Sequence, residues 1–102
     1  MLTSKQRAYL RGLAAKEDTI LQIGKDGITE KTAETMSDML RARELVKARV
    51  LENSMLTARE ACETLSARCR AEQVQVIGSK FVLYKRNEQK PVIELPKAAK
   101  KK

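Results

Sequence analysis

The residues with the clearest chemical potential form a short turn, Gly24-Lys25-Asp26-Gly27, between a β-branched run and a helical pattern. Two glycines let a phosphodiester approach the backbone closely, and Lys25 adds a positive charge at the tip. The N–H groups and dipole at the start of the following helix also attract phosphate oxygens. In KH domains a GxxG loop clamps a nucleic-acid backbone, although there it joins two helices. Most matches to so short a pattern are ordinary turns, so its neighbours must decide.

Basic residues dominate the chain. Its 102 residues include 21 Lys and Arg against 13 Asp and Glu, which gives a net charge of +8. Residues 1–16 hold Lys5, Arg7, Arg11 and Lys16 and no acid. A charged helix face is usually solvated surface, but this concentration favours a polyanionic partner, with nucleic acid first and an anionic membrane second.

The sequence has little that could support catalysis. It has no His, which removes the commonest general base and the commonest metal ligand, and the GxxG turn lacks the Gly-Lys-Ser/Thr ending of a P-loop. Cys62 and Cys69 lie about 10 Å apart on a helix, too far for a disulfide, and are predicted as core thiols in a reducing compartment, the cytoplasm. We expect no enzymatic activity, metal, cofactor or small-molecule substrate. The longest apolar run, Phe81 to Tyr84, is too short to span a membrane.

Seven elements must position these residues. Capping signals predict helices from Thr3 to about Ala15, from Thr29 to about Arg43 and from Thr57 to about Arg70. Apolar and β-branched runs predict strands at 19–23, 46–51, 73–77 and 81–85, the last two joined by the turn Gly78-Ser79-Lys80. Close helix packing is the expected reason for Gly12 inside the first helix, and close approach of RNA is the second reading.

The α-β-α-β-α-β-β order predicts an α/β fold, a two-layer sandwich with a four-stranded sheet. Helical connections of this length favour parallel pairing of the first three strands. Lys47 and Arg49 give the second strand one polar face, so one sheet face is open to water or only partly covered by the first helix. Parallel strands would bring the GxxG turn, loop 52–56 and the 78–80 turn to one edge, where Lys25 and Lys80 share a surface.

The pattern fades after residue 86. We expect residues 1–86 to form one domain and 87–102 to form a basic, flexible tail that ends in three lysines. Such a tail would add salt-sensitive, non-specific affinity for a polyanion.

Several blocks of the chain resemble the CRM domain, named for chloroplast RNA splicing and ribosome maturation, and its stand-alone bacterial YhbY-like members. The blocks are LTSKQR at 2–7, LRGLA at 10–14, IGKDGIT at 23–29, RELVK at 43–47, VQVIG at 74–78, VLYK at 82–85 and IELPK at 93–97. The resemblance implies a domain akin to the C-terminal domain of bacterial translation initiation factor three. It also implies RNA binding, since bacterial single-domain members associate with precursors of the large ribosomal subunit.

The resemblance also implies which residues meet RNA. Carried over by position, Gly24 to Gly27 is the family's GxxG loop, and the basic first helix supplies Lys5, Arg7 and Arg11. The chain departs from the pattern in two ways. Asp26 places a negative charge in the loop, and Ala14 and Ala15 stand where many members carry His.

These observations predict a monomeric, non-enzymatic protein that binds structured ribosomal RNA in large-subunit precursors, with no membrane partner. The predicted RNA-binding residues are Gly24, Lys25, Asp26, Gly27, Lys5, Arg7, Arg11 and Lys80, with Lys47 and Arg49 as a second candidate surface. Because only three residues are aromatic, specificity is expected mainly from RNA shape. The alternative is a module that docks an acidic or ribosomal protein through the sheet face and tail. An RNA-modifying enzyme is a third possibility, for which the sequence offers no cofactor motif.

Overall fold

The computed structural model describes residues 2–93 and 95. Its elements are α1 Ser4–Ala14, β1 Leu21–Ile23, α2 Glu30–Arg43, β2 Leu45–Val50, α3 Ala58–Cys69, β3 Glu72–Ile77 and β4 Lys80–Tyr84. This order confirms the predicted fold class. Each helix begins after a threonine whose side chain accepts the N–H three residues on, at Thr3, Thr29 and Thr57. Within the described residues, no helix is long and apolar enough to cross a membrane.

The four strands form one mixed sheet in the order β1-β2-β4-β3. β1 pairs with β2 in parallel, whereas β4 is antiparallel to both β2 and β3. The expected pairing of β3 with β2 is therefore wrong, although β1, β2 and β3 do run in the same direction. β4 takes an interior place because every side chain from Phe81 to Tyr84 is buried, whereas β3 carries the exposed Gln73 and the half-buried Gln75 and tolerates the edge.

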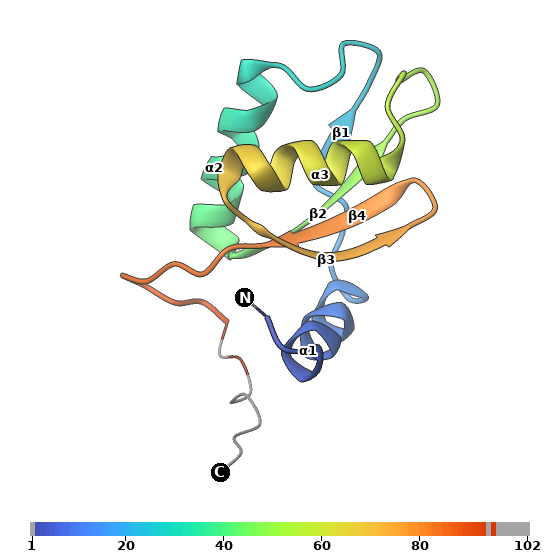
Figure 1. The fold of residues 1–102 in the computed structure, drawn as a ribbon. Helices are drawn as coiled ribbons and strands as arrows, with labels where there is room; N and C mark the ends of the chain where they lie inside the picture. The colour runs from blue at the N-terminus through green and yellow to red at the C-terminus, as the bar shows by residue number, and fades with distance from the viewer. Residues whose placement is uncertain (1, 94, 96–102) are drawn as a thin grey trace.

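Helices cover both faces of this sheet, but unequally. In Figure 1, α2 and α3 lie on one face and α1 lies on the other. Successive side chains of β4 alternate between the two cores. Phe81 and Leu83 join the core under α2 and α3, and Val82 and Tyr84 join a smaller core that includes Leu10 of α1. The first helix therefore covers only part of its face, which was one of the two arrangements predicted.

Two cationic side chains tie α1 to the sheet. The Lys47 ammonium donates to the carbonyl of Ala14 at 3.2 Å, and Arg7 Nε donates to the carbonyl of Gln73 at 3.4 Å. A cation at the last turn of a helix also interacts favourably with the negative end of the helix dipole. Gly12 plays no part in this docking, because a Cβ built there would meet nothing within 4 Å. The expectation that close helix packing requires this glycine is wrong.

A buried carboxylate joins the end of α2 to the segment after β4. Glu44 is 0% exposed and adopts a positive φ of 67° where α2 gives way to β2. Its Oε2 accepts the N–H of Asn87 at 2.6 Å, and its Oε1 accepts those of Val92 at 2.8 Å and Ile93 at 2.6 Å. Three amide donors replace the water that the carboxylate loses on burial.

The same contacts revise the expectation of a tail that is flexible from residue 87. Residues 87–93 are held to the domain by the Glu44 carboxylate, and Ile93 and Leu95 pack against the core beneath α1. The expected lysine-rich end lies outside the described residues.

Replacement of Glu44 with Gln tests this anchor. A Gln side chain keeps the volume but offers one acceptor oxygen instead of two, so at least one buried amide loses its partner. We expect urea denaturation to give a free energy of unfolding lower by about 1–3 kcal/mol. Glu34→Gln, which changes an exposed carboxylate on the same helix, is the control and should change it by under about 0.5 kcal/mol. Equal stability of the two variants would contradict the role of Glu44.

Both cysteines belong to the larger core. Cys62 and Cys69 are free and buried, as the sequence predicts, and the Cys69 thiol donates to the carbonyl of Ala33 at 3.6 Å. Burial, followed by the charge of Glu63, raises the pKa of Cys62 to about 11. Burial likewise raises the pKa of Cys69. Both thiols therefore stay protonated near neutral pH, where thiolate chemistry is unavailable to them.

The raised pKa of Cys62 predicts a loss of stability at alkaline pH. Between its ordinary value of 9.0 and about 11, the unfolded thiol releases its proton while the folded thiol keeps it. The free energy of unfolding should therefore be insensitive to this thiol below that range and fall as pH rises through it. Urea unfolding of the wild type and Cys62→Ala across the range checks this, because other titrating groups are common to both. Parallel pH profiles would refute it.

Candidate nucleic-acid interface

Three loops meet at the edge where β1, β2 and β3 end, and we call this the loop edge. It consists of the turn 24–27, loop 51–57 and the turn 78–79. Backbone bonds hold the loops together, since Leu51 N donates to Ile23 O at 2.8 Å and Val50 N donates to Ser79 O at 2.7 Å. The common direction of the three strands thus brings together the loops that the sequence predicts to meet. Figure 1 shows them at the side of the sheet away from the end of β4.

The GxxG turn presents its central residues to solvent. Gly27 N donates to Gly24 O at 3.0 Å, and Lys25 and Asp26 are exposed between them. Gly27 has a φ of +69°, a conformation that other residues adopt only with strain. Gly24 has no such requirement, and a Cβ there would lie 3.6 Å from Asn53 Oδ1, an ordinary contact. The turn therefore presents one cation and one adjacent anion at its tip.

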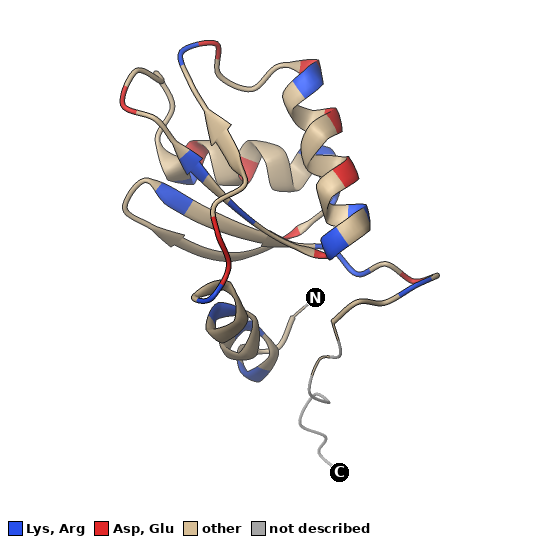
Figure 2. Ribbon diagram, turned by 180° about the vertical axis from the view of Figure 1, so that it is seen from behind, with Lys and Arg blue, Asp and Glu red and all other residues tan. Residues whose placement is uncertain are grey.

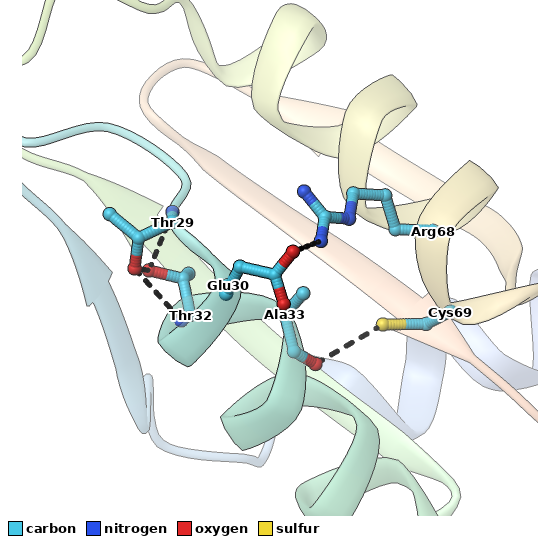
Figure 3. Close-up of polar contacts among 6 residues, drawn as sticks. All are labelled: Thr29, Glu30, Thr32, Ala33, Arg68 and Cys69. Atoms are coloured by element: carbon cyan, nitrogen blue, oxygen red, sulfur yellow. Dashed lines mark hydrogen bonds and ion pairs between the residues drawn. The ribbon is translucent and has the colours of Figure 1, made fainter.

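The start of α2 offers less to an anion than the sequence predicts. Thr29 N donates to Thr32 Oγ1 at 3.2 Å, and Thr32 N donates to Thr29 Oγ1 at 3.2 Å, so this capping box uses two donors (Figure 3). Glu30 adds a negative charge in the first turn and lies 3.6 Å from Arg68 of α3. The helix terminus is already capped, and anion attraction at this edge falls mainly to side chains.

Basic side chains continue from the loop edge onto the sheet face that α1 partly covers. Arg49 and Lys80 are partners in the β2–β4 register and lie on that face. Figure 2 shows basic positions on β2, at the start of β4 and along α1. A groove of about 370 Å³ separates α1 from the sheet, and we call it the α1 groove. Six of its lining residues are Arg11 of α1, Ala15 just after α1, Lys47 of β2, Gln75 and Ile77 of β3, and Lys80 of β4.

The structure places the predicted site residues in three regions. Gly24 to Gly27, Arg49 and Lys80 lie at or beside the loop edge, and Arg11 and Lys47 line the α1 groove. Lys5 is exposed in the first turn of α1, close to Leu2 and Gln6, which line a hollow with the end of β4. Arg7 is engaged with the β3 backbone. Lys5 and Arg7 are thus not gathered with the loop edge.

One feature of this surface is missed by the sequence reasoning. Ile77 lies at the end of β3, is 61% exposed and lines the α1 groove. The alternation of the strand could have revealed it, because Ile77 follows the polar Gln75 by two residues and shares its face. The sequence pattern predicts a strand over 73–77 and does not single out Ile77.

Comparisons with known proteins agree on one family. The profile of the CRS1 / YhbY (CRM) domain matches residues 2–85. The chain is 38% identical over 96 residues to a Bacillus subtilis protein named "Probable RNA-binding protein YqeI", covering 94% of this chain and 100% of the relative. It is 31% identical over 96 residues to a Haemophilus influenzae protein named "RNA-binding protein", covering 94% and 96% respectively.

A solved structure supports the fold directly. The solution structure of a hypothetical Staphylococcus aureus protein, described as a candidate RNA-binding protein, superimposes with a TM-score of 0.78. Its sequence is 49% identical, and the match covers 94% of this chain and 100% of that one.

The two glycines of the turn should respond differently to alanine. Gly27→Ala forces a side chain into a positive φ and should lower the free energy of unfolding by about 1–2 kcal/mol. Gly24→Ala adds only ordinary contacts and should cost clearly less, which makes it the matched control. Thermal or urea denaturation of both variants gives the comparison. An equal cost for the two would contradict the geometry described for the turn.

Proposed function

We propose that this chain is a non-enzymatic protein that binds structured ribosomal RNA in large-subunit precursors. The proposal starts from its family, because the chain belongs to the CRS1 / YhbY (CRM) domain family. Its relatives from Bacillus subtilis and Haemophilus influenzae are named as RNA-binding proteins. We further propose that it acts as a monomer in the cytoplasm. The observation that carries the proposal is the meeting of the GxxG turn with Arg49 and Lys80 at the loop edge in a chain of this family.

The proposed mechanism is recognition of the RNA backbone. Lys25 and the amides of the GxxG turn other than that of Gly27 hold one phosphate, and Arg49 and Lys80 extend the track across the sheet. A flexible ammonium or guanidinium can follow phosphates without reading bases, so this contact positions the RNA rather than selecting its sequence. Arg11 continues the track on α1, whereas Lys47 and Arg7 contribute chiefly by holding α1 in place.

Asp26 limits the affinity of the turn. Its carboxylate is exposed next to Lys25, so it opposes phosphate at the same tip. The loop then depends on its neighbours for net attraction, and affinity is spread over several cations. Such binding loses strength steeply as salt rises, because each phosphate contact releases counterions.

The substitution Lys25→Glu tests the loop and the target together. We expect the wild type to co-sediment with large-subunit precursors in a ribosome gradient, and to be released by ribonuclease. Lys25→Glu should move most of the protein to the top of the gradient, because the loop then repels phosphate. The control is Lys90→Glu, which makes the same change in net charge in the segment anchored by Glu44 and should leave co-sedimentation nearly unchanged.

Other outcomes identify what is wrong. Co-sedimentation that is indifferent to both the substitution and ribonuclease would favour docking to an acidic or ribosomal protein. A wild-type protein that stays at the top of the gradient would contradict the ribosomal target, and its binding to free structured RNAs would then be measured.

A further inference from the structure

The α1 groove combines two features that phosphate binding alone does not need. Its cations come from three different elements, Arg11 from α1, Lys47 from β2 and Lys80 from β4. Its lining includes apolar side chains, among them Ile77, which is 61% exposed, and Val82, which is buried. Single exposed apolar residues are common on protein surfaces. An exposed isoleucine inside a groove with three cations is a more specific arrangement.

The charges around the groove restrict what can occupy it. Among the described residues that line it, none is acidic, so an anionic occupant is favoured. Lys47 already donates to the carbonyl of Ala14, which leaves Arg11 and Lys80 as the cations whose side chains are exposed. A volume of about 370 Å³ lies at the lower end of the range for small-molecule pockets.

An unpaired nucleotide matches these features better than a duplex does. Paired RNA presents phosphates and 2′-hydroxyls on its outside and keeps the faces of its bases stacked, so it has no apolar face for Ile77. A bulged or looped-out nucleotide offers a flat base and an attached phosphate. Proteins hold such bases against aromatic or apolar side chains.

We propose that the α1 groove receives one unpaired nucleotide of the bound RNA, with its base on Ile77 and its phosphate between Arg11 and Lys80. This inference rests on the proposed function and adds the class of RNA that is bound. That class is an RNA helix interrupted by an unpaired nucleotide, which lies near the part of the RNA backbone held at the loop edge. Lys80 connects the two contacts, because it lies in the groove and also begins the strand that follows the 78–79 turn. Selectivity then has a contribution from a base as well as from shape.

The test compares three short RNAs, namely a duplex with one unpaired adenosine, the same duplex fully paired, and the bulged duplex with an abasic site at the bulge. Fluorescence anisotropy should show the wild type binding the bulged duplex about 5- to 10-fold more tightly than the other two. Ile77→Ser should remove this preference and leave affinity for the paired duplex unchanged. Ile77→Phe, with a larger surface for stacking, should keep or increase it. Val92→Ser, at an apolar residue 60% exposed outside the groove, is the control and should behave as wild type.

The outcomes separate this inference from the function beneath it. Equal binding of all three RNAs by the wild type, still weakened by Lys25→Glu, would overturn the groove inference alone. A bulge preference that survives Ile77→Ser would overturn it as well. Failure of the wild type to bind any structured RNA would instead overturn the proposed function. If Ile77→Ser weakened binding of poly-glutamate and left the RNA preference unchanged, the occupant would be an acidic protein segment, and the inference would be wrong.

Discussion

Because every side chain from Phe81 to Tyr84 is buried, β4 has to lie inside the sheet with a core on each side. Burial of side chains of this size contributes about 1.5–3 kcal/mol each, so an edge position for β4 would forfeit much of the stability of a small domain. The hairpin then places β3 at the outside, and β2 and β3 run in the same direction on either side of β4. The loop edge is a consequence of this packing, since it collects the ends of three strands that are not all neighbours.

Some basic residues serve structure and others are available for recognition, and hydrogen bonds distinguish the two roles. Lys47 and Arg7 donate to backbone carbonyls and fix α1 over the sheet. Lys25, Arg11 and Lys80 are exposed. At the start of α2 the capping box and Glu30 already occupy the positive end of the helix. The electrostatic attraction of this molecule therefore comes from placed side chains, which can be substituted one at a time, more than from the backbone.

Short-range signals in the sequence were sufficient for much of the structure. The threonine caps at Thr3, Thr29 and Thr57 set the helix starts, and the alternation from Val46 to Val50 set the faces of β2, because both depend on neighbours within a few residues. The buried role of Glu44 was not predictable in this way, because its three donors lie 43 to 49 residues further along the chain. The place of β4 could have been inferred from its unbroken apolar run. The exposure of Ile77 depends on how far α1 reaches across the sheet, which local pattern does not determine.

The anchoring of residues 87–93 by Glu44 bears on how the protein matures during its own synthesis. Translation proceeds toward the carboxyl terminus, so Glu44 is made 43 residues before Asn87 and 49 before Ile93. A nascent chain that has emerged only as far as β4 can pair its strands, but the carboxylate then keeps its hydration shell, because burial without a donor is costly. The three hydrogen bonds of Glu44 at the junction of α2 and β2 can form only after residues 87–93 have been made, which is later than the last strand residue, Tyr84. The end of the sheet opposite the loop edge therefore gains its last polar contacts after the sheet itself is complete.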